Sequence, residues 1–440
     1  MRIAFAFVAV VSCITAIAAQ NTASSSGFSC TTAVPPKYAG ATTIFAWGAN
    51  WYGQLSSPKD IEPRPYPLLV GSASMNVSKI TGGFMHNAVL DAAGNQAWLA
   101  GLAESGQMGG GPTVNTKQTQ YLPVPFIVDD VDPELFTRAV HDIAGGYQHT
   151  CLITQRFNWT TPQGVVYCSG NNDKGQLGRS DIESVTYILP VTATDPMFTA
   201  ASITALASGP DNMVALTSTG ELWSWGANSN GELGNGQTTD ANQPVRVHNM
   251  RNIVKIGCGF GFCAALDASG ILYGWGKNDR FQLGGASTEK AVAIPVQILA
   301  DVSDFSCGGA HMLAVVENRL YSWGEGTLGA TGHPKNIPSL VLDRWYVRTP
   351  TAVADFANVN IRSIAAGGKH SIVLDTCGVV YTFGSDSLGQ LGQEKLTAKR
   401  YQFRSLVAKT NANIKRRGVK PVAVYASWFN SFVVTEETAL

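Results

Sequence analysis

The 440-residue sequence predicts an all-β protein: a seven-bladed β-propeller of repeats about 50 to 70 residues long, closed by pairing its N- and C-terminal strands. Three observations predict this fold. Two short motifs each recur seven times in strict alternation. The propeller region opens on one motif and ends on the other. The composition, with 46 glycines and only 14% charged residues, suits many short strands joined by tight turns.

The first motif is a short apolar strand followed at once by a turn, as in WSWGANSNGELGNG at residues 223–236. Bulky residues such as Trp223 and Trp225 predict a buried strand, and the glycines and asparagines after them supply turn conformations that other residues resist. The chain is then expected to return through strands that start at a proline, as at Pro244 and Pro295. Five residues after the first glycine a second glycine follows in every copy except one, which has Phe281. The first glycines of the seven copies are Gly48, Gly101, Gly170, Gly226, Gly276, Gly324 and Gly384.

The second motif reads small-Gly-x-x-His and is followed by alternating apolar residues, as in GGFMHNAVL and GGYQHTCLI. Equivalent residues of a propeller are spread around its axis, so the motif histidines are expected to be structural rather than ligands of one metal ion. They are His86, His149, His311 and His370, and other copies have Asn212, Phe262 and Asn430. Cys258 and Cys307 occupy the small-residue column of this motif, so they are expected to be packing residues and not ligands.

The order of the motifs predicts how the ring closes. The strand-and-turn motif comes first, in TTIFAWG at residues 42–48, and the second motif comes last, in VYASWFNSFVV at residues 424–434. One blade must therefore combine strands from both ends of the chain, which hides the exposed edges of both.

Together the two motifs, Trp-Gly-x-Asn-x-x-Gly-Gln-Leu-Gly and small-Gly-x-x-His-x-x-x-Leu, resemble the repeats of the regulator of chromosome condensation superfamily over roughly residues 43–435. The resemblance implies a seven-bladed propeller but not one activity, because the superfamily hosts unrelated functions. Its founding activity is nucleotide exchange on a Ran-type GTPase, and a secreted bacterial member inhibits β-lactamases purely by binding. Light-sensing members carry Gly-Trp-Arg-His-Thr motifs, which are missing here, where the sites read GFMHN, GYQHT, GGAHM and GGKHS.

The N-terminus predicts a secretory route. Residues 1–19 have one Arg, an apolar run and small residues, which predicts a signal peptide cleaved after Ala18 or Ala19. A membrane anchor is the alternative, but the run is short for a span and lacks a basic flank, so stable membrane insertion is not expected. Residues 20–42 then form a linker and residues 43–440 the propeller. Asn76 and Asn158 start glycosylation sequons, and Cys151 and Cys168 flank a hairpin, either as a disulfide or as small buried thiols.

Three ranges depart from the repeat and are interpreted as inserts near 110–142, 333–360 and 393–420. The last holds nine basic residues and one acidic residue, against 22 and 30 in the rest of the chain. This concentration of charge indicates an anionic partner, which is an acidic protein, an anionic, sulfated glycan or a lipid surface. A solvated loop, or one that pairs with acidic residues of the same chain, is an equal alternative. In the second range, aromatic residues lie between arginines, as at binding hot spots, although a packed strand within the blade explains them slightly better. The candidate partner-binding residues are Lys399, Arg400, Arg404, Lys415, Arg416, Arg417, Arg344, Trp345 and Arg348.

These observations predict a secreted or luminal, monomeric binding protein without enzymatic activity, cofactor or metal. No nucleophile elbow, phosphate loop, His-Glu-x-x-His or Cys-x-x-Cys motif occurs in the sequence, and a formal charge of zero gives no electrostatic case for nucleic acid. Two alternatives stay open. One is nucleotide exchange on a Ran-type GTPase, and the other is glycan binding through the aromatic pair Trp51 and Tyr52.

Overall fold

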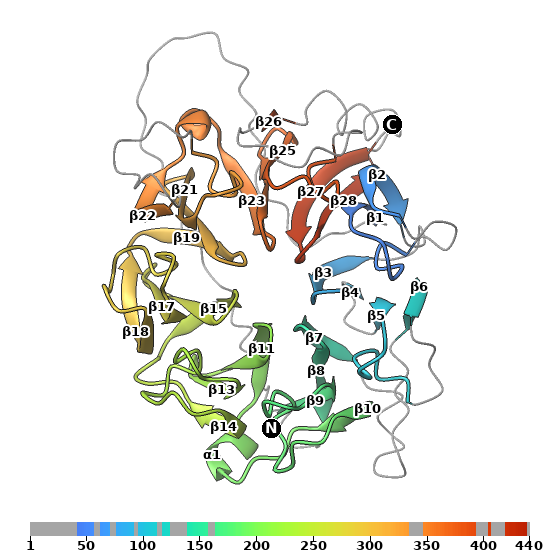
Figure 1. Cartoon of the computed structure of the whole chain (residues 1–440), viewed down its shortest axis with the longest axis vertical. Coiled ribbons are helices and arrows are strands. Elements are labelled where there is room, and N and C mark those ends of the chain that lie inside the picture. The colour runs from blue at the N-terminus through green and yellow to red at the C-terminus, as the bar shows by residue number, and fades with distance from the viewer. Residues whose placement is uncertain are drawn as a thin grey trace, which may run out of the picture. The chain divides into compact units, whose positions relative to one another are not determined.

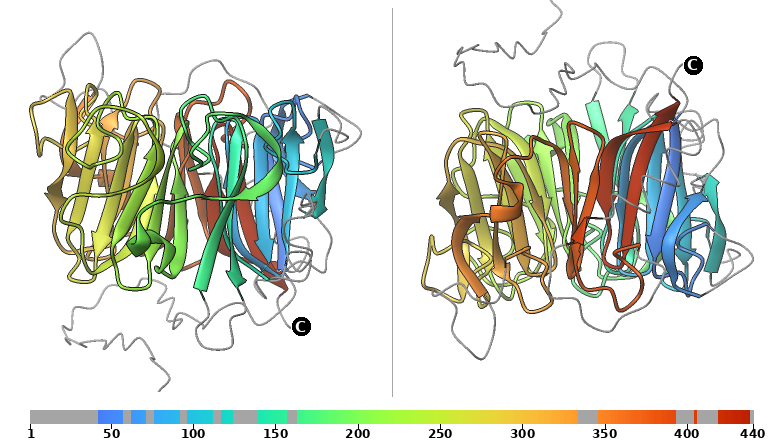
Figure 2. Two further views of the ribbon diagram at one scale, coloured as in Figure 1. Left: turned by 90° about the horizontal axis from the view of Figure 1, so that it is seen from below. Right: turned by 90° about the horizontal axis from the view of Figure 1, so that it is seen from above.

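The computed structural model describes residues 42–56, 62–70, 76–91, 96–111, 117–123, 139–156, 163–333, 346–392, 404–405 and 419–437. The strands lie within the compact unit Val34–Leu440 and form seven four-stranded antiparallel sheets around one axis (Figure 1). Seen from the side, the strands run between the two faces of the ring (Figure 2). The predicted all-β, seven-bladed propeller is confirmed.

Six blades are built from four consecutive strands, ordered from the axis outward. The first two blades contain β3 (Val77–Gly82), β4 (His86–Asp91), β5 (Ala97–Leu102) and β6 (Lys117–Pro123), then β7 (Val140–Gly145), β8 (His149–Arg156), β9 (Gln163–Gly170) and β10 (Val185–Pro190). The third and fourth contain β11 (Ile203–Ser208), β12 (Asn212–Thr217), β13 (Leu222–Gly226) and β14 (Ala241–Arg246), then β15 (Ile253–Cys258), β16 (Phe262–Asp267), β17 (Leu272–Lys277) and β18 (Ala291–Leu299). The fifth and sixth contain β19 (Val302–Cys307), β20 (His311–Val316), β21 (Arg319–Glu325) and β22 (Tyr346–Ala352), then β23 (Ile361–Ala366), β24 (His370–Asp375), β25 (Val380–Gly384) and β26 (Arg404–Ser405). Among the residues that the structure describes, the short helices α1 (Pro196–Thr199) and η2 (Ala354–Phe356) lie between blades in the chain.

The seventh blade joins the two ends of the propeller, as predicted. It contains β27 (Val419–Ala426) and β28 (Asn430–Glu437), followed outward by β1 (Thr42–Gly48) and β2 (Arg64–Val70). β1 pairs with β28 without interruption, from Thr42 opposite Glu436 to Gly48 opposite Asn430. Each end therefore contributes two strands, and closure leaves neither β1 nor β28 with an open edge.

The Asn and Leu of the first motif hold its turn together. The Leu55 N–H donates to Asn50 Oδ1 at 3.0 Å, and the Leu233 N–H donates to Asn228 Oδ1 at 2.9 Å. The same bond forms at Leu177, Leu283 and Leu391, where the acceptors are Asn172, Asn278 and Asp386. The side-chain oxygen of Asn or Asp thus satisfies a buried backbone donor of the tight turn, which explains why one of these residues recurs five residues before Leu.

In four of the turns, at Gly106, Gly175, Gly231 and Gly389, the second glycine packs against the outer strand of the next blade. Gly175 has φ +76°, and a Cβ built there would lie 2.5 Å from the Cα of Asn242 in β14. Gly231 has φ +76°, and its Cβ would lie 2.5 Å from the Cα of Ala293 in β18. Both the left-handed backbone and the close approach of two main chains therefore require glycine.

The return strands and the three interpreted inserts differ from the sequence interpretation. Strand β14 begins at Ala241 rather than at Pro244, and its register against β13 shifts between Ser224 and Gly226, where the extra residues around Pro244 are accommodated. Proline is tolerated at such a bulge on an outer strand because no ladder bond needs its nitrogen. The inserts are not wholly additional segments, since 110–142 contains β6, 333–360 contains β22 and 393–420 contains β26, each the outer strand of its blade.

Candidate binding site at the mouth of the axial cavity

A cavity of about 130 Å³ lies where the inner strands of all seven blades end. Its lining includes the small-residue column of the second motif, which places small side chains at the point where seven strands converge. These residues are Gly82, Gly145, Ser208, Cys258, Cys307, Ala366 and Ala426. We call the face on which the inner strands end the motif face, because the loops of the second motif and the turns of the first motif both lie there.

Aromatic side chains gather at the mouth of this axial cavity. Two residues before the motif histidine position, four blades carry an aromatic residue, and one further aromatic follows in the seventh blade. We call these residues the aromatic mouth: Phe84, Tyr147, Phe260, Trp428 and Phe429. The rings of Phe84 and Tyr147 stack with centroids 4.3 Å apart, and Phe84 lies edge-on to Phe429 at 5.0 Å. Phe260 of the fourth blade reaches Trp428 of the seventh at 5.7 Å, so the cluster connects blades that are far apart around the ring.

The fifth and sixth blades carry glycine at the position that is aromatic in four other blades. Their loops have the glycine pairs 308–309 and 367–368, which line the axial cavity. Backbone hydrogen bonds connect these loops from blade to blade: Phe260 N donates to Gly309 O at 3.0 Å, Gly309 N to Gly367 O at 3.1 Å and Gly368 N to Trp428 O at 3.0 Å. A Cβ on Gly309 would lie 2.4 Å from Gly368 O, so glycine permits this close approach. The loops of the aromatic mouth are thus held by main-chain bonds.

Phe260 is the exposed member of the aromatic mouth. Its side chain is 46% exposed, whereas the other four aromatic residues are partly buried. The ammonium of Lys277 lies 5.5 Å from the centroid of its ring, a cation–π contact that leaves the outer surface of the ring accessible. Burial raises the pKa of the Asp211 carboxyl in the third-blade loop, against the opposing charge of Lys174. The mouth combines an apolar surface with a small number of charges, as protein-binding patches do.

The motif histidines connect neighbouring blades beneath the mouth. His86 Nε2 lies 3.0 Å from Thr150 Oγ1, His149 Nε2 3.1 Å from Ser208 Oγ, and His311 Nε2 2.9 Å from Ser371 Oγ. In each case the hydroxyl belongs to the next blade. Burial lowers the pKa of His86 and of His370 to about 4, and of His149 and of His311 to about 3. At neutral pH all four are therefore uncharged parts of the blade interfaces. Within the described ranges, no three His, Cys, Asp or Glu residues are grouped so as to hold a metal ion.

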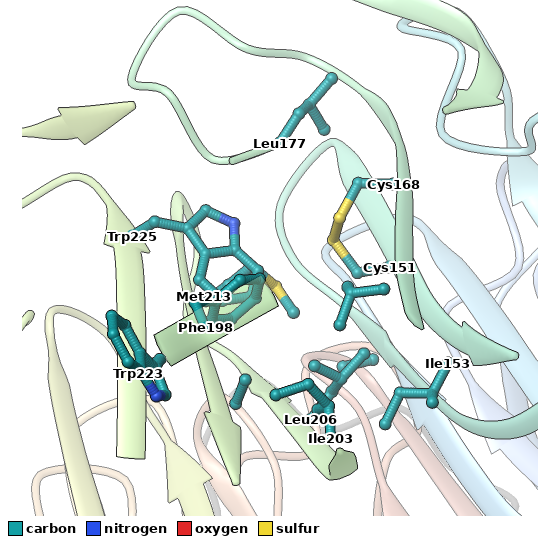
Figure 3. Packing of buried hydrophobic residues seen from close by; sticks show 13 residues of the cluster. Cys151, Ile153, Cys168, Leu177, Phe198, Ile203, Leu206, Met213, Trp223 and Trp225 are labelled. Carbon is teal, nitrogen blue, oxygen red and sulfur yellow. A yellow bond between two sulfur atoms is a disulfide. The ribbon is translucent and has the colours of Figure 1, made fainter. Parts of the chain in front are cut away.

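Four of the cysteines in the described ranges form two cross-strand disulfides. Cys151 and Cys168 lie opposite each other on β8 and β9 and are joined with an S–S distance of 2.02 Å, in the core that packs the second blade against Trp225 and Phe198 (Figure 3). The interpretation of Cys258 as a packing residue is wrong, because it is bonded to Cys263. In every blade, the residue after the motif histidine position lies opposite the small residue of the same motif on the neighbouring strand. Two cysteines five residues apart in this motif, as Cys258 and Cys263 are, therefore indicate a cross-strand disulfide. Cys307 keeps its thiol, and burial raises its pKa to about 12.

Of the candidate partner-binding residues, Arg348 is the one whose side chain the structure describes. It is exposed on β22, with its guanidinium 4.8 Å from the ring centroid of Phe281. Arg404 lies in β26, and only its backbone is described. Arg344, Trp345, Lys399, Arg400, Lys415, Arg416, Arg417, the sequon residue Asn158, residues 1–19 and all of the linker but Thr42 lie outside the described residues.

The other predicted surface residues lie on separate parts of the propeller. Asn76 precedes β3 and is partly buried, and Trp51, in the turn of the seventh blade, is 41% exposed. Neither is among the residues of the aromatic mouth. The sequence interpretation missed that mouth because it treated the two positions before the motif histidine as variable. Comparing those positions among the seven copies would have found it.

The seven blades, the closure by two strands from each end and the two interleaved motifs define a β-propeller of the regulator of chromosome condensation type. The family model described as the RCC1-like domain matches residues 132–440, and the chain belongs to this family. Among the described residues, no helix is long and apolar enough to cross a membrane.

Relatives share the propeller over part of their length. The Ultraviolet-B receptor UVR8 of Arabidopsis thaliana is 32% identical over 269 residues, which cover 59% of this chain and 56% of the receptor. The X-linked retinitis pigmentosa GTPase regulator of Canis lupus familiaris is 30% identical over 358 residues, which cover 80% of this chain and 32% of the regulator. The chain thus spans about half of one relative and a third of the other.

Solved structures show the same fold. Human WBSCR16 superposes with a TM-score of 0.74 at 20% identity, covering 91% of this chain and all of that one. Prp20p from Saccharomyces cerevisiae, described with its binding properties to Gsp1p and histones, superposes with a TM-score of 0.74 at 22% identity, covering 91% and 93%. At 20% and 22% sequence identity, these two structures show that the chain has the same fold.

Proposed function

We propose that this chain is a non-enzymatic binding protein of the secretory pathway or extracellular space, and that its propeller engages another protein through the aromatic mouth. The observation that carries the proposal is the gathering of aromatic side chains from four blades, with Phe260 46% exposed, on loops held by main-chain bonds. Aromatic residues dominate binding hot spots because they bury a large area at little cost in side-chain entropy. Loops that are already fixed lose little further freedom on binding.

Three observations support the secretory route. Residues 1–19 have the composition of a signal peptide, and two sequons occur in the chain. The two disulfides, Cys151–Cys168 and Cys258–Cys263, are the kind of cross-link that persists in oxidising compartments.

The state of the histidines supports a binding role over acid–base catalysis. His86, His149 and His311 share hydrogen bonds with hydroxyls of the next blade, and their pKa values lie at least two units below neutrality. A general base works best with a pKa near the operating pH and within reach of substrate. These groups stabilise the blade interfaces instead.

Two alternatives use other parts of the same fold. One relative is named a GTPase regulator, and the structure of Prp20p is described with binding to Gsp1p, which favours nucleotide exchange on a Ran-type GTPase as a second candidate. Glycan binding would use Trp51, which is 41% exposed. A purified Ran-type GTPase loaded with a fluorescent nucleotide tests the first, and binding of sulfated and neutral oligosaccharides to the Trp51→Ala variant tests the second.

Site-directed photo-crosslinking in secreting eukaryotic cells tests the proposed function. One chain carries p-benzoylphenylalanine in place of Phe260, and a matched control carries it in place of Ser269, which is exposed in the β16–β17 turn on the opposite face. We expect the chain in the culture medium and a discrete protein adduct from position 260 alone. The adduct should disappear in a Trp428→Ala background. Equal labelling from both positions, or none from position 260, would overturn binding through the mouth, and retention of the chain in the cytosol would overturn the route.

A further inference from the structure

One turn of the propeller has a non-glycine residue at a position where the backbone conformation favours glycine. The second turn position is glycine in six copies, with φ between +76° and +83°, and the seventh copy has Phe281 in the same left-handed region, at φ +60°. A residue with a Cβ is disfavoured there, and strain of this kind persists where the surroundings over-determine it, often at functional sites. The strain of Phe281 therefore needs a compensating contact or use.

The ring of Phe281 lies on the outer strand of the next blade rather than in a core. Its centroid is 5.8 Å from that of Tyr346 and 4.8 Å from the guanidinium carbon of Arg348, both on β22. Phe281 and Tyr346 are partly exposed, and Arg348 is exposed. Four of the equivalent glycines bring two main chains together, whereas this blade interface has an aromatic and arginine surface in place of that backbone contact. We call Phe281, Tyr346 and Arg348 the rim patch.

The charge of Arg348 is not neutralised within the described part of the chain. Its neighbour Arg280 is paired with Glu325, and Lys277 is paired with Asp279 at 3.6 Å. No carboxylate of the described residues forms an ion pair with Arg348. Stacking on Phe281 orients the planar guanidinium and leaves its N–H groups for an acceptor. A guanidinium held in this way suits a carboxylate, which accepts two parallel bonds.

We propose that the rim patch binds an acidic segment of a partner protein, with a carboxylate on Arg348 and an adjacent apolar side chain on Phe281 and Tyr346. This proposal rests on the proposed function, and it specifies the chemistry of the partner that would bind on the motif face. A peptide is favoured over a sulfated glycan because the patch offers one uncompensated cation beside apolar rings. A sulfated chain needs several cations along its length.

Peptide selection tests the proposal directly, because random peptides sample the chemistry of a partner that is not yet identified. A displayed library of random 12-residue peptides is selected on the immobilised full-length chain and counter-selected on its Arg348→Ala variant. We expect enrichment of Asp or Glu next to Leu, Ile, Phe or Trp. Selected peptides should lose at least tenfold in affinity on Arg348→Ala and on Phe281→Gly, measured by fluorescence anisotropy, and their Asn or Gln counterparts should lose as much on the wild type.

Two variants separate binding from folding. Phe281→Gly restores the repeat residue, so its Tm should be equal to or above that of the wild type while peptide binding falls. Arg246→Ala is the matched control, because Arg246 also stacks on an aromatic ring, Trp223 at 5.5 Å, but is already paired with Glu221. It should leave peptide affinity unchanged.

The outcomes also distinguish this proposal from the proposed function. Selection that yields no acidic enrichment, or peptides that bind Arg348→Ala as well as the wild type, overturns the rim patch even if position 260 crosslinks to a partner. If a sulfated oligosaccharide displaces the bound fluorescent peptides and the same peptides without a label do not, the patch is assigned to a glycan instead. Acidic peptides that require Arg348 in a chain without any crosslink at position 260 support the patch and overturn the mouth.

Discussion

Trp225 of the third blade donates its indole N–H to the main-chain oxygen of Gln176, in the turn of the second blade, at 3.0 Å. The same bond runs from Trp47 to Gln390 O, from Trp275 to Glu232 O and from Trp323 to Gln282 O. Tryptophan and turn therefore recur together because the strand of one blade fastens the turn of its neighbour. The apolar strand and the turn-forming segment that follows it are two halves of one repeated interface.

Replacing Trp225 by Phe tests this interface. The change leaves the buried Gln176 oxygen without its donor and removes part of a fully buried ring, so the free energy of unfolding should fall by about 2 to 4 kcal/mol. Urea unfolding measures it. The exposed Trp51→Phe variant, as a control, should change stability by less than about 0.5 kcal/mol.

The turn glycines allow a matched comparison of strain with steric clash. Gly231 and Gly236 have φ +76° and +82°, but a Cβ would lie 2.5 Å from Ala293 Cα at the first and no closer than 3.7 Å to any neighbour at the second. Gly236→Ala should cost about 1 to 2 kcal/mol from backbone strain alone. Gly231→Ala should cost clearly more, because two strands must separate. Equal losses in urea unfolding would show that the close approach of the main chains is unimportant.

Removing the last strand should open the ring. A chain ending at Pro421 lacks β28 and most of β27, which exposes the edge of β1 and uncovers the buried side chains of Phe45 and Trp47. We expect loss of the cooperative thermal transition or a Tm lower by more than 15 °C. Removing only residues 438–440 is the control. An unchanged Tm for the shorter chain would contradict closure through β1 and β28.

The four buried histidines make stability depend on pH. Their folded-state pKa values of about 3 to 4 lie below the unfolded value of 6.5. Between these limits the unfolded chain binds protons that the folded chain does not, so stability is complete above pH 6.5 and is lost as the pH falls. At pH 5 each histidine lowers the free energy of unfolding by about 2 kcal/mol.

A single substitution isolates this effect. Asparagine occupies the histidine position in two other blades, at Asn212 and Asn430, so His370→Asn is a replacement that the repeat already accommodates. Between pH 7.5 and pH 5 the variant should lose about 2 kcal/mol less of its free energy of unfolding in urea than the wild type, and the difference in slope approaches one proton, or about 1.4 kcal/mol per pH unit, only near pH 5. An identical slope in both proteins would mean that His370 binds protons as readily in the folded chain as in the unfolded chain.

The sequence predicted the fold because the residues of the repeat make contacts that are local to one turn or to the adjacent blade. Asn50, Gly231 and Trp225 each act within a turn or on the adjacent blade, so their spacing carries the architecture. The aromatic mouth was not predicted because its members are contributed by four blades and become neighbours only when the ring closes. Cys258–Cys263 was missed for another reason, since the partner lies beyond the motif column that was compared. Phe281 was recognised as a departure, but its contact with Arg348 depends on how the outer strand of the next blade is placed.

The mixed seventh blade also has a consequence for biosynthesis. A ribosome completes β2 at Val70 before it makes the strands of the other blades, and it begins β28 at Asn430 after all the rest, 360 residues later. At translation rates of about 5 to 20 residues per second, the β1–β2 hairpin waits for roughly 20 to 80 seconds with its inner edge unpaired. During that interval it is a template for pairing with other nascent chains. Faithful production of this propeller therefore depends on shielding that hairpin until synthesis reaches its partner strand.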